Sequence, residues 1–156
     1  MILDANVLLY AVDESSVHHS RAATWLSEAL NGDERVGLPW QTLGAFLRIA
    51  THSRVSATPL TASRAQDHVD RWLRTDVAWV PAAGDRTMRV YAELARRHHV
   101  TGNLVPDAQL AALAIENGVA VVSNDSDFAR FPEVRWVNPF RPTEAVDVGH
   151  REAGSG

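Results

Sequence analysis

The sequence contains neither cysteine nor lysine among its 156 residues. Without cysteine the chain can form no disulfide and no cysteine-ligated zinc or iron–sulfur site. Without lysine it lacks the residue required by a Walker-A phosphate-binding loop or by catalysis through a Schiff base. All 15 basic side chains are therefore arginines, a bias that a GC-rich genome would also produce.

Long hydrophobic runs are absent as well. No apolar segment is long enough to span a membrane, and residues 1–4 lack the basic start of a signal peptide. We therefore expect a cytoplasmic protein without membrane contact. The net charge of −4 argues against a protein that coats nucleic acid through bulk charge, although a local basic patch is compatible with it.

The residues that are present indicate one folded domain, because 46% are hydrophobic and 22% are charged. We expect this domain at residues 1–140 and a polar, mobile tail at 141–156. Apolar runs predict strands at 2–10, 35–38, 77–80, 119–122 and 133–137. Helical spacing of apolar residues predicts helices at 20–30, 39–50, 61–73, 86–98 and 106–116. We expect Thr61 to cap the helix at 61–73 and Asn117-Gly118 to end the one at 106–116. The helix at 86–98 should turn inward its Met88, Tyr91, Ala92 and Ala95. Alternating strands and helices predict an α/β sandwich on a mainly parallel sheet.

Four aspartates fall where such a sheet places its ligands, beyond the carboxyl ends of the strands. Asp4 interrupts the first apolar run, and Asp125 and Asp127 follow the predicted strand at 119–122. Asp107 lies in the first turn of a predicted helix, where the helix dipole favours an acid. If the two strands are neighbours, all four carboxylates meet at one edge of the sheet.

A group of carboxylates needs a counter-charge. Two of them about 4 Å apart repel by roughly 4 kcal/mol at an effective dielectric constant of 20. A divalent cation removes this repulsion, and ligands that are all oxygen favour Mg²⁺ or Mn²⁺ over zinc. A cation held in this way can polarise a phosphate and activate a water for in-line attack. The four aspartates therefore predict a metal site for phosphate chemistry.

Each aspartate also has an ordinary structural explanation. Asp125 and Asp127 could cap a turn, and Asp107 could be a favourable acid at a helix start. Asp4 is harder to explain in this way, because a carboxylate rarely interrupts an apolar strand without a partner, and Asn6 could cap the turn after it. The shared position of all four acids carries the metal hypothesis.

At these residues the chain resembles the PIN-domain family, and within it the VapC toxins of bacterial toxin–antitoxin pairs. The matching stretches are LDANV at 3–7, PDAQLAALA at 106–114 and VVSNDSDF at 121–128. Residues 39–52 also look like the second helix of the family. The resemblance covers the chain from Met1 to about Phe140, and the order and spacing of the stretches make it fairly specific.

The resemblance implies a three-layer α/β/α sandwich that cuts RNA with Mg²⁺ or Mn²⁺, leaving a 5′-phosphate and a 3′-hydroxyl. It implies that Asp4, Asp107 and Asp125 are metal ligands, that Asp127 assists them, and that the hydroxyl of Ser123 supports the site. It further implies a homodimer, and a cognate antitoxin whose tail enters the active-site groove.

One position departs from the family pattern. Where the family places a glutamate in its second helix, this chain has Ala45, preceded by Gly44. The nearby Gln41 and Thr42 carry no charge and cannot replace a carboxylate. A catalytically impaired module that survives as an antitoxin-binding protein is therefore the alternative to an active nuclease.

A phosphatase of the haloacid-dehalogenase type is a third class that also places an aspartate after its first strand. That chemistry needs a second aspartate two residues later and a lysine downstream. Here the position is Asn6, and the chain has no lysine. The sequence therefore disfavours this class.

Other polar and aromatic residues have more ordinary interpretations. The histidine pairs at 18–19 and 98–99 are adjacent, so their side chains point about 100° apart on a helix, which favours exposed positions over a zinc site. Arg48 and Arg54 are either solvated or in contact with RNA phosphates, and the sequence leaves both open. We expect core or dimer-interface positions for most of the five tryptophans, at 25, 40, 72, 79 and 136.

Overall fold

The structure is a computed structural model that describes residues 1–56 and 58–141. Within these residues the chain forms a five-stranded sheet in the order β3-β2-β1-β4-β5, and every neighbouring pair is parallel. The strands are two residues long, shorter than the predicted segments that contain them: β1 Ile2–Leu3, β2 Val36–Gly37, β3 Ala78–Trp79, β4 Val121–Val122 and β5 Trp136–Val137.

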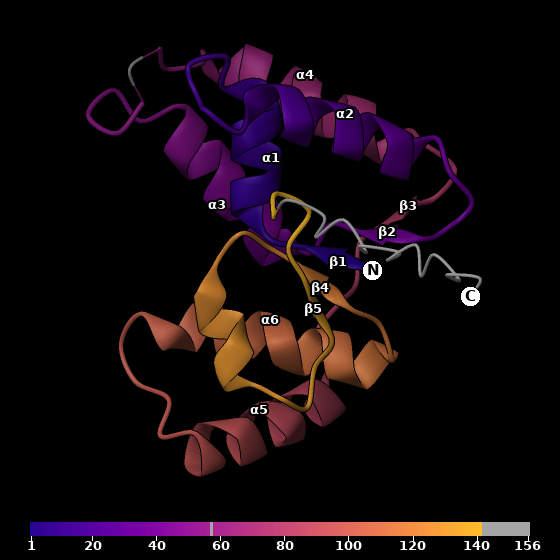
Figure 1. Cartoon of the computed structure of the whole chain (residues 1–156), viewed down its shortest axis with the longest axis vertical. Coiled ribbons are helices and arrows are strands. Elements are labelled where there is room, and N and C mark those ends of the chain that lie inside the picture. The colour runs from indigo at the N-terminus through magenta and orange to yellow at the C-terminus, as the bar shows by residue number, and fades with distance from the viewer. Residues whose placement is uncertain (57, 142–156) are drawn as a thin grey trace, which may run out of the picture.

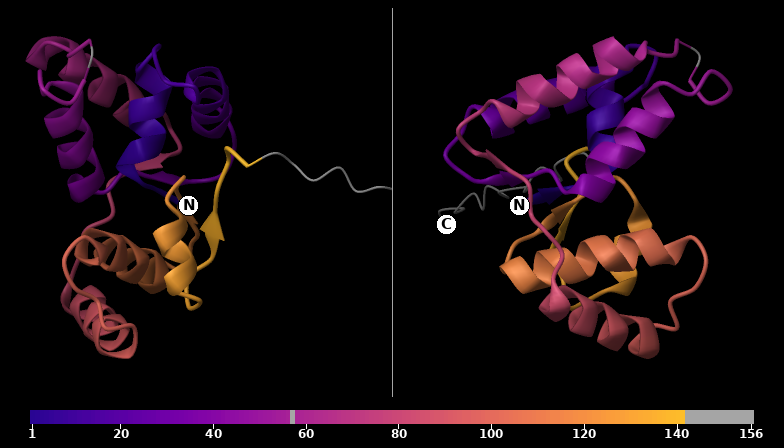
Figure 2. Two further views of the ribbon diagram at one scale, coloured as in Figure 1. Left: turned by 60° about the vertical axis from the view of Figure 1, so that its left-hand side comes forward. Right: turned by 180° about the vertical axis from the view of Figure 1, so that it is seen from behind.

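Helices cover both faces of this sheet, as Figure 1 shows and as two further directions in Figure 2 confirm. One layer holds α1 Ala5–Val12, α2 His19–Leu30, α3 Trp40–Ala50 and α4 Ala62–Leu73. The other holds α5 Asp85–Arg97, α6 Leu104–Asn117 and the 3-10 helix η1 Ser126–Arg130. The predicted three-layer α/β/α sandwich with a parallel sheet is confirmed.

The two layers have separate hydrophobic cores because side chains alternate across the strands. Leu3 and Val122 point into the core formed with α1 to α4. Their neighbours Ile2 and Val121 point into the core formed with α5, α6 and η1. Burial of both faces explains why the strands are continuous apolar runs in the sequence.

Local signals at helix ends are confirmed. The Thr61 side chain accepts a hydrogen bond from the backbone N–H of Arg64 and caps α4. Gly118 ends α6 in the left-handed conformation, with φ of 65°.

The first predicted strand, at 2–10, is wrong beyond Leu3. The side chain of Asp4 accepts a hydrogen bond from the N–H of Ala5, and α1 begins there. Val7 and Leu8 are fully buried, but on a helix. A short apolar run fits a buried helix as well as a buried strand, so the sequence pattern did not separate the two.

The inward face predicted for the helix at 86–98 is also partly wrong, because Met88 is 62% exposed. Thr87 and Leu94, two turns apart, are the buried residues of α5. The Thr87 hydroxyl donates to Glu116 of α6 and so turns that side of α5 inward.

Gly37 of β2 lies where neighbouring strands approach closely. A Cβ there would lie 2.9 Å from Cγ1 of Ile2 and 3.1 Å from the carbonyl oxygen of Met1. We expect Gly37→Ala to destabilise the fold by about 1–3 kcal/mol in urea unfolding. Gly44→Ala is the matched control: a Cβ at this mid-helix position meets nothing within 4 Å, so alanine should stabilise by roughly 1 kcal/mol. Equal effects at both positions would contradict this packing argument.

In the described part of the chain, no helix has the length and apolar character needed to cross a membrane. The tail predicted at 141–156 lies outside the described residues apart from Arg141, whose guanidinium sits 4.7 Å from the ring centre of Trp136.

Candidate metal centre

The centre lies at the carboxyl edge of the sheet, where β1 and β4 end side by side. Leu3 pairs with Val122 in parallel register, and the N–H of Asp4 donates to the carbonyl of Val122 at 3.0 Å. Asp4 and Ser123 therefore emerge next to each other. The two strands that the sequence analysis assumed to be neighbours are neighbours.

Ser123 connects both strand ends. It is fully buried, and its hydroxyl donates to Oδ2 of Asp4 at 2.6 Å. The hydroxyl oxygen of Ser123 in turn accepts hydrogen bonds from Nδ2 of Asn6 and from the backbone N–H of Asp125, both at 2.9 Å. One buried hydroxyl thus orients an acid on each of the two loops.

Asn6 makes more hydrogen bonds than the turn cap predicted for it would require. Its Nδ2 donates to Oδ2 of Asp4 at 2.8 Å, and its Oδ1 accepts from the N–H of Asn124 at 3.2 Å. It therefore joins the start of α1 to the loop after β4. The sequence signal was an amide two residues after a buried acid, but the partner, 118 residues away, was not visible in it.

Three aspartates converge beyond this network. Asp107 comes from the first turn of α6, and Asp125 and Asp127 come from the start of η1. One carboxylate oxygen from each lies within 4.8 Å of the other two. Asp125 also caps η1 by accepting from the N–H of Asp127 at 2.8 Å, so the capping role and membership of the cluster hold together.

Asp4 lies beside this cluster without being a member of it. Its carboxylate accepts hydrogen bonds from the N–H of Ala5, from Asn6 and from Ser123. The negative charge of Asp4 nevertheless reaches Asp107 and raises its pKa. The structure thus groups three of the four predicted acids and holds the fourth, hydrogen-bonded, close to them.

Burial and repulsion between the carboxylates dominate the electrostatics of the centre. Burial raises the pKa of Asp107 to about 7, with further contributions from the charges of Asp125, Asp4 and Asp127. Burial also raises the pKa of Asp4, although the hydrogen bonds from Ser123 and Ala5 oppose the shift. An all-oxygen donor set with mutual repulsion suits a hard divalent cation such as Mg²⁺ or Mn²⁺.

Helix α3 contributes no acid to the centre. Ala45, at the position of the expected glutamate, is half-buried. The buried hydroxyl of Thr42 donates to the carbonyl oxygen of Leu3 at 2.8 Å, and Gln41 is exposed. Thr42 therefore anchors α3 to the end of β1 and provides no charge.

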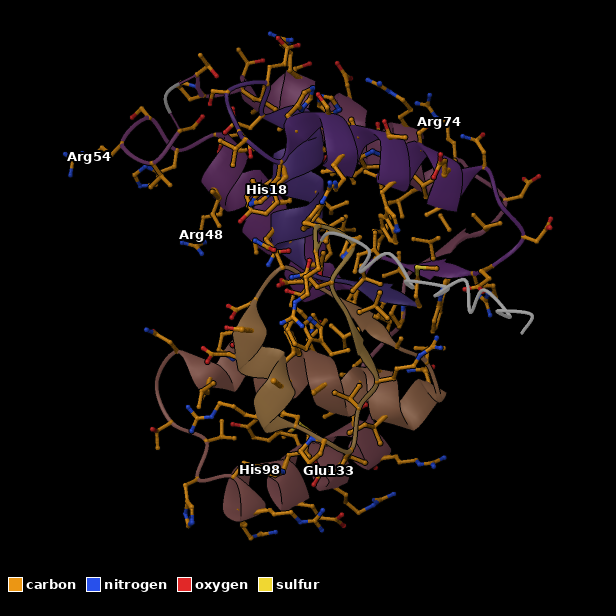
Figure 3. The ribbon with its side chains drawn as sticks, in the orientation of Figure 1. His18, Arg48, Arg54, Arg74, His98 and Glu133 are labelled. Carbon is orange, nitrogen blue, oxygen red and sulfur yellow. The ribbon has the colours of Figure 1, made fainter. Side chains whose placement is uncertain are left out.

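The histidines take other positions than predicted, because three of the four are half-buried. His18 packs against the rings of Tyr10 and Phe140. His98 and Glu133 lie side by side (Figure 3), and Nε2 of His98 is 3.0 Å from the Glu133 carboxylate. Contacts with aromatic rings and with one acid account for this burial.

Residues 1–134 match the family model described as the PIN domain. The chain is 44% identical over 138 residues to Ribonuclease VapC37 of Mycobacterium tuberculosis, covering 88% of this chain and 96% of that protein. It is 39% identical over 141 residues to Ribonuclease VapC33 of the same species, covering 90% and 99%.

Solved structures with the same fold include VapBC2 from Rickettsia felis bound to a promoter DNA fragment, with a TM-score of 0.66 at 18% identity, covering 88% of this chain and 96% of that one. VapBC-1 from nontypeable Haemophilus influenzae matches with a TM-score of 0.62 at 15% identity, covering 90% and 98%. At these identities the likeness supports the fold.

Proposed function

Because this chain belongs to the PIN domain family, we propose that it is a metal-dependent endoribonuclease and the toxin of a toxin–antitoxin pair. The observation that carries the proposal is the convergence of Asp107, Asp125 and Asp127, with Asp4 beside them, at the carboxyl edge of the sheet. The relatives named as ribonucleases, which match almost over their full length, support RNA as the substrate.

In this proposal each acid has a defined task. Asp107, Asp125 and Asp127 would hold the cation, and Asp4 would supply the fourth carboxylate. The hydrogen bonds of Ser123 and Asn6 hold the carboxylate of Asp4 beside the loop after β4. When bound, Mg²⁺ or Mn²⁺ supplies an activated water for in-line attack on the phosphodiester.

The test is cleavage of total cellular RNA by the purified protein with Mg²⁺ or Mn²⁺. EDTA should abolish cleavage and added Mn²⁺ should restore it, and the Asp4→Asn variant should be inactive. Cleavage that persists in EDTA would contradict the metal mechanism, and cleavage by the variant would point to a contaminating nuclease.

We propose further partners on the same basis. The structural neighbours described as VapBC assemblies support a cognate antitoxin, and the sequence resemblance supports a homodimer. The cytoplasm, where an RNA-cleaving toxin meets its substrate, is the proposed location.

The second candidate is an impaired module that binds an antitoxin without cutting RNA, and Ala45 is the observation that favours it. We expect Ala45→Glu to raise the apparent affinity for Mn²⁺ at least about tenfold, because it adds one carboxylate charge. A Mn²⁺ titration of cleavage measures this, with Ala45→Gln as the matched uncharged control.

The outcome of this titration separates the two candidates. If the unmodified protein cleaves RNA and Ala45→Glu improves this cleavage, the chain is an active nuclease with a weakened metal site. Cleavage that appears only after Ala45→Glu supports the impaired module. An equal gain in Ala45→Gln would show that charge is not the cause.

A further inference from the structure

The outward face of α3 carries an unusual combination of residues. Its inner face buries Thr42, Leu43, Phe46 and Ala50. The outward face consists of the exposed residues Trp40, Gln41, Gly44 and Arg48.

Trp40 is the only exposed residue among the five tryptophans, all of which lie in the described part of the chain. Its side chain is 79% exposed, whereas Trp72 is 6% exposed. A large aromatic ring left in water forgoes the stabilisation that burial would provide, and tryptophan of this kind is typical of a binding surface.

Gly44 follows Trp40 by one helical turn and has no structural need to be glycine. A Cβ at this position meets nothing within 4 Å, yet glycine inside a helix is less favourable than alanine. Helical side chains lean over the preceding turn, so any longer residue at 44 would cover the indole of Trp40. The glycine leaves the face of this ring open to a ligand.

This face begins next to the aspartates. The bond from Thr42 to the carbonyl of Leu3 fixes the first turn of α3 at the end of β1, one residue before Asp4. Trp40 therefore stands at the same edge of the sheet as the candidate metal centre. Trp40 follows β2 and Asp4 follows β1, and these two strands are parallel neighbours in the sheet.

Arg48 extends the face by one further turn. Its side chain points away from α3 in Figure 3, and within residues 1–56 and 58–141 its guanidinium has no ion-pair partner. An exposed guanidinium without an ion-pair partner among the described residues is suited to pair with a phosphate. An aromatic ring followed by a cation along one face matches the alternation of base and phosphate in a nucleic-acid strand.

We propose that the outward face of α3 binds the single-stranded RNA substrate, with one nucleobase stacked on Trp40 and one phosphate paired with Arg48. The inference rests on the proposed nuclease function. Stacking on an aromatic ring requires an unpaired base and tolerates any base identity. The face would therefore favour single strands and contribute little to sequence preference.

The experiment measures binding separately from cleavage. Fluorescence anisotropy follows labelled single-stranded oligoribonucleotides of A, U, C or G on Asp107→Asn protein, in which cleavage is removed. Adding Trp40→Ala or Gly44→Leu should weaken binding of all four about tenfold. Arg48→Ala should reduce the slope of log affinity against log salt by about 0.7. Met88→Ala, another exposed apolar residue on the opposite layer, is the control and should change neither quantity.

Two readouts guard against other causes. Gly44→Leu should raise the melting temperature, because leucine is the better helix former, so weaker binding cannot be attributed to unfolding. Sedimentation should give the same mass for Trp40→Ala and the parent protein. A change in mass with unchanged RNA binding would mean that a second copy covers Trp40, and would overturn the proposal.

The remaining outcomes are also decisive. Unchanged RNA binding in Trp40→Ala or Gly44→Leu overturns the role of this face, while RNA cleavage by the wild-type chain leaves the proposed function standing. If the wild-type chain cuts no RNA and Asp107→Asn protein binds none, the proposed function fails together with the inference.

Discussion

Asp107→Asn is expected to abolish RNA cleavage and, at the same time, to raise the melting temperature of the metal-free protein at about pH 8. Loss of residues that only orient metal ligands reduces metal affinity about 10- to 100-fold, so loss of a ligand should reduce activity more than about a hundredfold. The stabilisation follows from the position of Asp107, which is half-buried among three other carboxylates.

The pH dependence of this stabilisation has a defined sign. Asp107 has a pKa of about 7 in the folded protein and an ordinary value of 3.8. Above pH 7 the folded state bears the whole cost of the buried charge, and this cost disappears as the pH falls from about 7 to about 4. The gain in melting temperature of Asp107→Asn should therefore shrink over that range.

Thermal unfolding in EDTA at several pH values, beside cleavage assays with Mn²⁺, measures both effects. Asp33→Asn is the matched control, because this exposed acid lies in the loop leading into β2, at the opposite edge of the sheet. A melting temperature that falls in Asp107→Asn, or a gain that does not depend on pH, would contradict the proposed charge repulsion.

Ser123→Ala is expected to weaken Mn²⁺ affinity about 10- to 100-fold, although Ser123 is not one of the acids of the centre. The substitution removes the hydroxyl that orients Asp4 and accepts from the N–H of Asp125. It also leaves buried polar groups without a partner, which should reduce the free energy of unfolding by about 1–3 kcal/mol.

Isothermal titration with Mn²⁺ and urea unfolding measure these two quantities. Ser126→Ala is the matched control, because Ser126 is exposed on η1 three residues further along. If Ser123→Ala lowered stability without any loss of Mn²⁺ affinity, the hydroxyl would have no part in positioning the acids. Unchanged stability would contradict the accounting of its hydrogen bonds.

The sequence by itself determined the fold class and the edge at which a site would form. Apolar runs separated by helical spacing are local patterns, and they predicted the layers, the cap at Thr61 and the stop at Gly118. The position of Asp4 after a buried run was likewise visible, because a charge is rarely tolerated there without a partner. Short-range physics is sufficient for all of these.

The tertiary structure decided the rest, because it depends on contacts between distant residues. The sequence did not reveal that the chain changes from strand to helix at Asp4, because the apolar Val7 and Leu8 can be buried on either element. The hydrogen bond between Ser123 and Asp4 joins residues 119 positions apart, and the docking of α6 and η1 at one sheet edge brings Asp107 to Asp125 and Asp127. The exposure of Trp40 also depends on tertiary packing, because the neighbours of α3 determine which face of the helix is buried and which stays exposed.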